Sequence, residues 1–513
     1  MYLRRVQIPN FRILKDIDLS FEHEFIPHIF PVASLNGGGK STLLQLVFVL
    51  LHCSGKAERL HYLKNMLEGI KNFSFDNEFT LATFDILHKG KSVSVEFLIW
   101  DDTYIQKLLK NTDTEFKLSA IPAFARIKKH FDTVREQVNK LEDLYSDLQE
   151  VNVKQSKKGQ MRIISNLKSV LSQLKNDLRI TLPKDLTDKL WDNDEEIFIY
   201  KHDTFSEFSE QINKKLPSIL KDIKERLQDL EKQTVTLSNI VTAINQYLNS
   251  QKLIYLTNFS IEDEDKAKKR DGCLLCRIDG MKSDDVKSFL NDIADNVFLA
   301  IPITQIAFFL PQEERHLLFE KPKSYMSYQT VLSEAQSALP GFFTWDFKML
   351  ASIFKVLIAA QTADFQEAVR TDGKYGNSYE TLIKELNMFL DPKKIKIKAD
   401  RSGNLSGIKV EIEKDGKFIQ IPYEDLSHGE LRKLTFYVWL KNINMKNSLV
   451  LVDEIEIAFN PDWQYNIVSN LQDWSPNNQY LLATHSFDLC QALPPAHVKA
   501  LEPKLEKRAE VQP

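Results

Sequence analysis

The segment ASLNGGGKST, residues 33–42, constrains the fold more than any other part of the sequence. The apolar run IPHIFPVA (26–33) precedes it, and the apolar run LLQLVFVLLHC (43–53) follows it. A strand, a glycine-rich turn and a helix in this order form a phosphate-binding loop, because backbone N–H groups at the helix start can surround a phosphate. The loop residues that we expect to contact a nucleotide are Asn36, Gly37, Gly38, Gly39, Lys40, Ser41 and Thr42.

Each polar residue of this loop has an expected role. Lys40 would reach the β- and γ-phosphates of ATP, and the Ser41 hydroxyl would ligate Mg²⁺. Ser34 stands where the usual motif has its first glycine, and serine costs little there if its φ is not positive. A glycine-rich turn without a ligand is the alternative, but chance rarely places GGGKST between a strand and a helix.

Two carboxylates end a second apolar run, NSLVLVDEIE (447–456). A strand that delivers Asp453 beside the loop lets this carboxylate orient the water shell of Mg²⁺, and Glu454 can then activate the attacking water. Taken alone, an apolar run followed by Asp-Glu is common and is often structural.

Two further motifs flank this carboxylate pair. LSHGE (426–430) opens an expected helix, and QYLLATHSFDL (479–489) is an apolar run that reaches His485. LSHGE differs by one residue from LSGGE, the signature of ABC-type ATPases. The chain resembles the ABC-type ATPases of the SMC and Rad50 kind, and more closely their compact branch in bacterial defence, with the overcoming-lysogeny-defect nucleases and the Septu ATPase subunit PtuA. The resemblance covers roughly residues 1–100 and 295–500.

The resemblance implies a nucleotide that is held between two heads. One head would supply Lys40 and Ser41, and the other would supply Ser427, Gly429 and Glu430. The family roles would make Asp453 the ligand of the metal-bound water, Glu454 the general base and His485 the γ-phosphate sensor, with Arg12 at the nucleotide and Gln312 at the metal.

Three positions depart from the family pattern. His428 places a bulky imidazole in a signature that faces phosphate, and with Ser34 it could slow turnover or regulate closure of the site. Asn460-Pro461 stands where this branch more often has His-Pro.

We expect an α/β fold, namely an ABC-type ATPase head with a mixed sheet and a phosphate-binding loop, interrupted by a short antiparallel coiled-coil or helical insertion. With 513 residues the chain is long enough for two or three structural parts. The expected parts are the N-terminal half of the head at 1–120, the insertion at 121–252 and the C-terminal half of the head at 253–513. The segment ITQIAFFLP (303–311), directly before Gln312, is expected to be a strand.

Apolar residues recur at alternating spacings of four and three in the insertion, which is typical of a coiled-coil seam. The series are Ile127, Phe131, Val134, Val138, Leu141, Tyr145, Leu148; then Ile164, Leu167, Leu171, Leu174, Leu178; then Leu220, Ile223, Leu227, Leu230, Thr234, Leu237, Val241, Ile244, Leu248. We expect a short antiparallel stalk that reverses at VKQSKKGQ (153–160). An ordinary helical bundle lobe is the alternative.

A CxxC motif, Cys273 and Cys276, raises the question of a zinc site. DGCLLCRIDG is expected to be a strand, on which positions i and i+3 point to opposite faces. One CxxC without a second pair is also weak evidence for zinc. Two buried thiols are the favoured interpretation, and a metal site is the alternative.

Composition restricts the location and the partners. A net charge of −4 gives no overall attraction to nucleic acid, so such contact would depend on local basic segments such as KAKKR (266–270) and KKIKIK (393–398). Four cysteines fit a reducing cytoplasm. The early charges exclude a signal peptide, and the apolar run at 43–53 is about half a membrane span. We therefore expect a cytoplasmic protein that does not bind membranes.

The resemblance also implies the activity and the partners. It implies an ATPase that uses ATP and Mg²⁺ and forms a homodimer or higher oligomer through its heads. PtuA-like ATPases work with a separate HNH nuclease (PtuB-like), and retron-associated forms also work with a reverse transcriptase and its msDNA. We therefore expect the regulatory subunit of an anti-phage defence complex that gates an HNH nuclease.

Other functions are weighed against this expectation. The chain shows no HNH signature, and about 28 residues follow His485, too few for the Toprim nuclease domain of overcoming-lysogeny-defect proteins. The alternative is a RecF- or SMC-like ATPase of DNA repair or chromosome maintenance. An ABC transporter is disfavoured, because its loop and signature lie only about a hundred residues apart.

Overall fold

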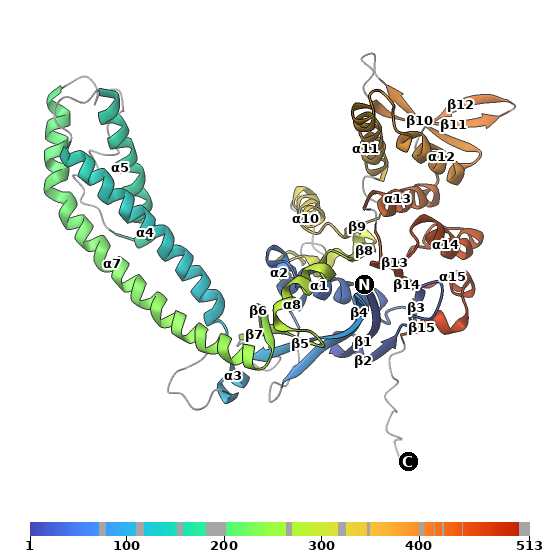
Figure 1. Cartoon of the computed structure of the whole chain (residues 1–513), viewed down its shortest axis with the longest axis horizontal. Coiled ribbons are helices and arrows are strands. Elements are labelled where there is room, and N and C mark those ends of the chain that lie inside the picture. Colours follow the sequence, from blue (N-terminus) through green and yellow to red (C-terminus); the bar gives the residue numbers. More distant parts are fainter. Residues whose placement is uncertain are drawn as a thin grey trace. The chain divides into compact units, whose positions relative to one another are not determined.

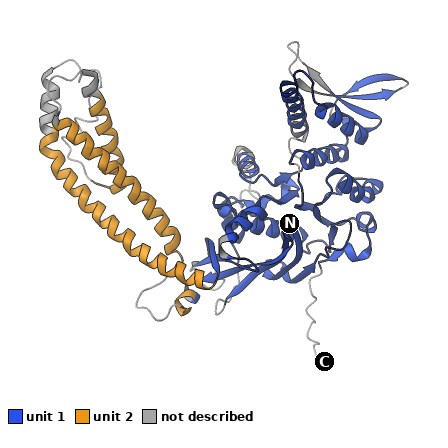
Figure 2. Cartoon of the chain, viewed as in Figure 1, with its two compact units in different colours: residues 1–104, 252–513 blue, residues 105–251 orange. Residues whose placement is uncertain are grey.

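The computed structural model describes residues 1–70, 78–108, 117–150, 157–180, 202–262, 269–315, 325–345, 349–399, 405–414, 416–422, 425–443 and 445–501 (Figure 1). The chain forms two compact units, which are coloured separately in Figure 2. Residues 1–104 and 252–513 form the first, here called the head unit, and residues 105–251 form the second, here called the insertion unit. The compact insertion unit begins at residue 105, within the short helix α3 (Asp102–Leu108), and the expected insertion began at residue 121.

A parallel sheet of six strands lies at the centre of the head unit. Its order is β15-β3-β14-β13-β8-β9, and every pairing is parallel. The strands are β3 (Ile29–Ala33), β8 (Val297–Ile301), β9 (Phe342–Thr344), β13 (Leu449–Asp453), β14 (Gln479–Thr484) and β15 (Lys499–Ala500). Helices cover both faces, which explains the continuously apolar strand sequences.

Alternate residues of β13 face the two cores on either side of this sheet. Leu449 and Leu451 pack in the core that contains α1 (Lys40–Cys53). Val450 and Val452 pack in the core that contains α13 (His428–Ile443) and α14 (Pro461–Trp474). The strand is therefore fixed from both faces, and its carboxyl end carries Asp453.

The head unit also contains an antiparallel sheet of six strands, which come from both of its sequence segments. Its order is β2-β1-β4-β5-β7-β6. The strands are β1 (Tyr2–Phe11), β2 (Leu14–Ser20), β4 (Phe79–His88), β5 (Lys91–Asp101), β6 (Leu253–Glu262) and β7 (Lys269–Asp279). The insertion unit lies between β5 and β6 in the sequence, so this sheet combines strands from before and after the insertion unit.

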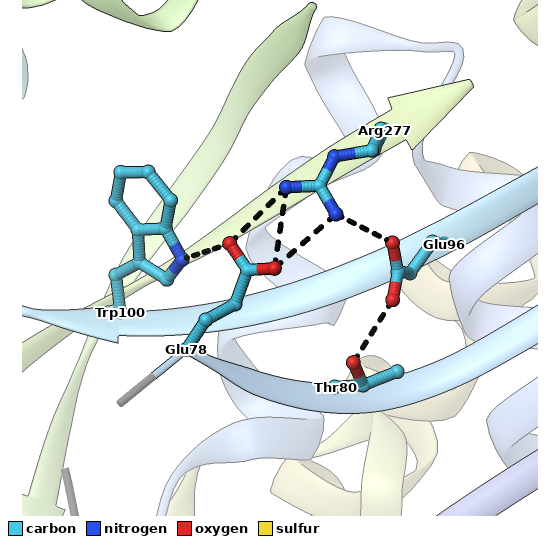
Figure 3. Close-up of polar contacts among 5 residues, drawn as sticks. All are labelled: Glu78, Thr80, Glu96, Trp100 and Arg277. Atoms are coloured by element: carbon cyan, nitrogen blue, oxygen red, sulfur yellow. Dashed lines mark hydrogen bonds and ion pairs between the residues drawn. The ribbon is translucent and has the colours of Figure 1, made fainter. Parts of the chain in front are cut away.

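A polar cluster on this sheet connects strands from both sides of the interruption (Figure 3). Arg277 of β7 forms ion pairs with Glu78 (3.1 Å) and with Glu96 of β5 (2.8 Å). The hydroxyl of Thr80 donates to Glu96, and the indole N–H of Trp100 donates to Glu78. The cluster therefore holds residues of the N-terminal part of the head against a strand that comes after the insertion.

Both cysteines of the CxxC motif lie on β7 and are buried. Burial raises the pKa of the Cys276 thiol well above its usual range. Cys276 belongs to the core beneath the antiparallel sheet, whereas Cys273 does not, as expected for positions on opposite faces of a strand. The expected strand and the expected burial of both thiols are confirmed.

The remaining elements of the head surround the two large sheets. They are η1 (Ala57–Arg59), α2 (Leu60–Leu67), α8 (Ser283–Ala294), η3 (Ile303–Phe309), α9 (Gln312–Arg315), α10 (Tyr325–Ala338), α11 (Met349–Arg370), α12 (Ser378–Leu390), β10 (Lys393–Ala399), β11 (Leu405–Lys414), β12 (Lys417–Ile421), α15 (Phe487–Gln491) and η6 (Pro495–His497). β10, β11 and β12 form a separate antiparallel sheet in which β10 is an edge strand. The basic segment at 393–398 lies on β10, while residues 266–268 of the other basic segment lie outside the described residues.

The expected strand at 303–311 is wrong, because Ile303–Phe309 form the 3₁₀ helix η3. Pro302 and Pro311 bracket the segment, and β8 has already filled the strand position next to β13. A short apolar run has no period that separates a strand from a buried turn of helix.

Among the described residues, the long helices of the insertion unit are α4 (Ala120–Glu150), α5 (Lys157–Leu178) and α7 (His202–Ser250). Its core uses the expected seam positions, including Val134, Val138 and Leu141 of α4, Leu167, Leu171 and Leu174 of α5, and Ile223 of α7. Figure 1 shows α4 and α7 running side by side in opposite directions, with α5 as a third helix. The expected reversal at 153–160 lies largely outside the described residues.

The coarse fold expectation is confirmed: an α/β head carries a phosphate-binding loop and is interrupted by an antiparallel helical insertion. Within the part of the chain that the structure describes, no helix is both long enough and apolar enough to cross a membrane.

Candidate nucleotide site

The phosphate-binding loop connects β3 to α1 with the geometry that its glycines allow. Gly37 and Gly39 have φ values of 78° and 91°, which other residues rarely adopt. A Cβ on Gly38 would lie 2.3 Å from Ser34 Oγ, and one on Gly39 would lie 2.7 Å from Leu14 Cδ2. The loop is therefore packed tightly against its own first residue and against the turn between β1 and β2.

Ser34 fits this loop without backbone strain, since it is absent from the described residues with positive φ. Its Oγ donates to the carbonyl of Leu35 (2.9 Å) and accepts from Lys40 Nζ (3.2 Å). Serine at this position thus adds a side-chain contact to Lys40 that a glycine would lack.

Lys40 lies at the first turn of α1 and is only 6% exposed. Its Nζ lies 2.8 Å from Nε2 of His485, which follows β14, and 3.3 Å from the carbonyl oxygen of Ser34. Burial lowers the pKa of Lys40, and the charges of Asp453, Glu456 and Glu454 oppose this shift. The expected loop lysine and the expected terminal histidine are therefore brought together.

Asp453 ends β13 and is completely buried. Neither of its carboxylate oxygens has a hydrogen bond of normal geometry among the described residues, although the nearby Ser41 hydroxyl partly lowers its pKa. Burial raises the pKa of Asp453 to about 7, and the charges of Glu454 and Glu456 add to the rise. Mg²⁺ prefers oxygen ligands, and the Asp453 carboxylate and the Ser41 hydroxyl together supply such oxygens. These residues therefore fit the metal that the loop motif implies.

Glu454 is held by its backbone while its side chain remains partly exposed. It has a φ of 53°, its N–H donates to the carbonyl of Ala483 (2.9 Å), and its carbonyl accepts from Arg432 Nη2 (2.7 Å). A left-handed conformation at a non-glycine residue requires support from its surroundings, and these two bonds supply it. The carboxylate is thus presented beside Asp453 by a fixed backbone.

Glu456 is a third carboxylate at this site, and the sequence interpretation missed it. It is 7% exposed, and its Oε1 accepts from the backbone N–H of His485 (2.8 Å). Its Oε2 has no hydrogen-bond partner among the described residues. Glu456 therefore fixes the position of His485, which in turn contacts Lys40.

Arg432 and Trp345 were also missed. Arg432 of α13 stacks on the Trp345 ring, with its guanidinium carbon 4.5 Å from the ring centroid. The indole N–H of Trp345 donates to the carbonyl of Asp453 (3.1 Å), and Arg432 donates to the carbonyl of Glu454. These contacts connect the helix that LSHGE opens to the backbone of the carboxylate pair.

LSHGE forms the start of α13, as expected. Ser427 and Glu430 form a capping box: Ser427 Oγ accepts from the N–H of Glu430 (3.2 Å), and Glu430 Oε2 accepts from the N–H of Ser427 (2.7 Å). Glu430 also forms an ion pair with Lys393 (2.9 Å). A Cβ on Gly429 would lie 2.4 Å from the carbonyl oxygen of Ala458, so glycine is required where this helix packs on the loop after β13.

Asn460 has a local explanation for its departure from the family pattern. Its side chain accepts from the N–H of Trp463 (2.8 Å), and Pro461 occupies the first turn of α14. Asparagine is a favoured N-cap residue, and proline suits the first helical position. The Asn-Pro pair therefore starts α14.

Arg12 and Gln312 lie near the end of α2. Arg12 Nη2 donates to the carbonyl of Met66 (3.2 Å), and burial lowers its pKa to about 10. The side chain of Gln312, at the start of α9, lies over Gly69. Ile13, the neighbour of Arg12, contacts the loop glycine Gly39, so Arg12 borders the phosphate-binding loop.

One protein family matches part of the chain. The family described as "AAA domain, putative AbiEii toxin, Type IV TA system" matches residues 288–489, which is less than half of the chain. The matched region includes LSHGE, the carboxylate pair and His485 but not the phosphate-binding loop. Comparison with curated protein sequences gives no match.

Solved structures of Smc heads are similar to the chain at low scores. The Smc head domain of Pyrococcus furiosus with an extended coiled coil, bound to the C-terminal domain of ScpA, has 10% sequence identity and a TM-score of 0.29, and the match covers 96% of this chain and 92% of that chain. The Smc head domain of Pyrococcus yayanosii with a coiled coil and joint has 12% identity and a TM-score of 0.29, and the match covers 96% of this chain and 93% of that chain.

The family match and the site geometry support the same coarse statement. Lys40 lies near Asp453, Glu454 and His485 at one edge of the parallel sheet, although these residues are far from Lys40 in the sequence. The chain is an ATPase-type nucleotide-binding protein, with a match to an AAA domain over residues 288–489.

Proposed function

We propose that this chain binds and hydrolyses ATP with Mg²⁺ between two paired heads, and that the paired state gates a partner HNH nuclease in an anti-phage complex of the Septu kind. The observation that carries the proposal is the buried, unpartnered Asp453 carboxylate beside Ser41, with Lys40 directed toward the same edge of the sheet. A site with this much buried charge is costly unless a ligand completes it.

Residues of one head would perform the chemistry of the site. Lys40 would leave His485 and Ser34 to bind the β- and γ-phosphates. Ser41 and Asp453 would hold Mg²⁺, which when bound offsets the negative charge of the phosphates. Glu454 would accept a proton from the attacking water, and His485, held by Glu456, would contact the γ-phosphate.

The second head would supply the signature residues. Ser427 and His428 are exposed at the start of α13, where backbone N–H groups and the helix dipole favour a phosphate. Gly429 and Glu430 are instead occupied by contacts within their own chain, so they would position the helix start. The contact from Arg432 to Glu454 would connect the signature of a head to its own carboxylates.

The nuclease partner is the finer part of the proposal. The family that matches residues 288–489 is described by a toxin of a type IV toxin–antitoxin system, which fits a role in defence. In the proposed complex the nucleotide biases two head arrangements, and the partner responds to the difference. A retron reverse transcriptase with its msDNA would be a further partner.

Reconstitution tests the gating proposal. The purified chain alone should cut neither DNA nor tRNA with any nucleotide, and cutting should appear when a partner HNH nuclease is added. Lys40→Ala and Glu454→Gln should change the nucleotide dependence of that cutting. Metal-dependent cleavage by the chain alone, lost in its own point variants, would contradict the proposal.

A RecF- or SMC-like ATPase of DNA repair or chromosome maintenance is the second candidate. The antiparallel pair of α4 and α7 in the insertion unit favours it, because long paired helices are typical of SMC-like proteins. In that case DNA alone should stimulate ATP hydrolysis, without any nuclease partner. The absence of stimulation by single- or double-stranded DNA would argue against this second function.

A further inference from the structure

A cavity of about 370 Å³ lies at the end of α1 opposite the phosphate-binding loop. Its lining includes His52 in the last turn of α1, Asn296 directly before β8 and Ser448 directly before β13. Lys40 and His52 are separated by about 18 Å along the helix axis. The cavity is therefore at the amino-terminal edge of the parallel sheet and is separate from the candidate nucleotide site.

Arg59 is a buried cation in the wall of this cavity. It is only 7% exposed, and its Nη1 donates to Nε2 (3.0 Å) and to the backbone carbonyl (3.4 Å) of His52. Its Nε has no hydrogen-bond partner, and among the described residues no carboxylate forms an ion pair with it. A guanidinium has five N–H donors, and leaving a buried one without an anion is costly.

His52 does not compensate the charge of Arg59. Burial, followed by the charge of Arg59, lowers the pKa of His52 to about 3, so the ring is neutral at physiological pH. The ring also stacks on Phe48, with 4.5 Å between the ring centroids. His52 therefore accepts a hydrogen bond from the guanidinium as a neutral ring, and it does not offset the positive charge of Arg59.

The other charged groups of the lining keep the cavity positive. Lys446 is exposed and lines the same cavity. The carboxylate in the lining is that of Asp295, and it already forms an ion pair with Lys56 at 2.9 Å. Arg59 and Lys446 thus remain as two positive charges that the surrounding residues do not balance.

We propose that this cavity binds a small phosphate-bearing ligand through Arg59 and Lys446. Two uncompensated cations match a phosphate monoester, which carries nearly two negative charges at neutral pH, better than a carboxylate. The Nη2 of the guanidinium can donate charge-assisted hydrogen bonds to phosphate oxygens, while Nη1 donates to His52. The cavity is larger than a bare phosphate, so it has room for the group that carries the phosphate.

Calorimetric titration of the full-length Lys40→Ala protein tests this site apart from the phosphate-binding loop. Inorganic phosphate and AMP should each bind at one site, and adenosine should not bind. Arg59→Gln in the same background should weaken phosphate and AMP binding at least about tenfold, because it removes the positive charge and its charge-assisted hydrogen bonding. Lys446→Ala should also weaken binding, and Lys64→Ala, an exposed cation on α2 outside the cavity, should leave it unchanged.

The two variants protect the test against a folding defect. Arg59→Gln changes a buried side chain, so its Tm must be measured, whereas Lys446→Ala changes an exposed one. No binding of phosphate or AMP to the Lys40→Ala protein would overturn the proposal. Unchanged affinity in Lys446→Ala and in folded Arg59→Gln would also overturn it. Because Lys40 is absent throughout, failure of the proposed ATPase function would not produce either result.

Discussion

Lys40 is the residue on which nucleotide binding depends most directly. Lys40→Ala should abolish measurable ATP binding while the protein stays folded, because the change removes only the ammonium contacts to Ser34 and His485 at the site and leaves the helix backbone intact. Equilibrium binding of a fluorescent ATP analogue measures this effect. Lys64→Ala is the matched control, and binding equal to that of the wild type in Lys40→Ala would exclude this loop as the site.

Glu454 tests the chemical step separately from binding. Glu454→Gln should keep ATP bound and slow its hydrolysis by about a hundredfold or more, since help from a general base is commonly worth that much. Release of phosphate in single-turnover reactions is the measurement. A variant that hydrolyses ATP as fast as an active wild type would show that Glu454 is not the base.

The raised pKa of Asp453 predicts that the stability of the metal-free protein depends on pH. Its pKa is about 7 when folded and about 3.8 ordinarily, so the folded state holds this proton more tightly than the unfolded state. The free energy of unfolding should therefore fall as pH rises from about 4 to about 7. An asparagine at this position cannot ionise, so the free energy of unfolding of Asp453→Asn should not fall in this way. It should exceed that of the wild type by up to a few kcal/mol at pH 8 and by little at pH 4.

Urea unfolding of both proteins in EDTA measures this difference. The comparison between wild type and variant cancels the titration of other groups. A stability difference that is the same at pH 5 and pH 8 would mean that Asp453 is already ionised at the lower pH.

Among the site residues, those in continuous motifs could be predicted and those that act across the fold could not. The GGGKST motif predicts phosphate binding and the Asp-Glu pair predicts a metal ligand and a general base, each from its own residues. The structure places Lys40 near these carboxylates. Glu456 matters because its carboxylate meets a backbone N–H 29 residues away, and Arg432 because its side chain meets a carbonyl 22 residues away. Such contacts depend on how β13, β14 and α13 pack, which no local pattern encodes.

At the scale of elements, Arg277 joins the strands on either side of the interruption. Arg277→Met would leave Glu78 and Glu96, both about one quarter exposed, facing each other without a cation. We expect a loss of about 1–3 kcal/mol in the free energy of unfolding. Lys89→Ala breaks an exposed ion pair with Asp292 and should cost less than about 1 kcal/mol, so chemical denaturation of both variants gives a matched comparison.

An equal cost for the two substitutions would show that the Arg277 cluster behaves as an ordinary surface ion pair. The cluster would then not hold the antiparallel sheet together.

Elements with a strong period or a clear boundary were predictable. Most of the predicted seam positions of α4 and α5, such as Val134, Leu141 and Leu171, are buried, and the helix after the loop starts at Lys40. Segment 303–311 was not predictable, because two prolines and a short apolar run are compatible with both a strand and η3. The three-stranded sheet of β10, β11 and β12 also lacks a pattern that predicts its place in the fold.

At the scale of the whole molecule, the account requires two heads for one complete site. Ser427 lies at an exposed helix start, so Ser427→Arg should place bulk and charge between paired heads and prevent ATP-dependent association. Ser427 is also the N-cap of α13, and Ser427→Asn is therefore the matched control that keeps the cap. Association lost equally in both variants would point to the cap and not to the interface.

Light scattering of the Glu454→Gln protein with and without Mg²⁺-ATP tests the central claim most directly. Because this variant should hold ATP without consuming it, the account predicts at least a dimer of the 59.4 kDa chain with ATP. Adding Lys40→Ala or Ser427→Arg should remove the ATP-dependent part of that mass. A monomer at every nucleotide concentration would contradict the paired-head site.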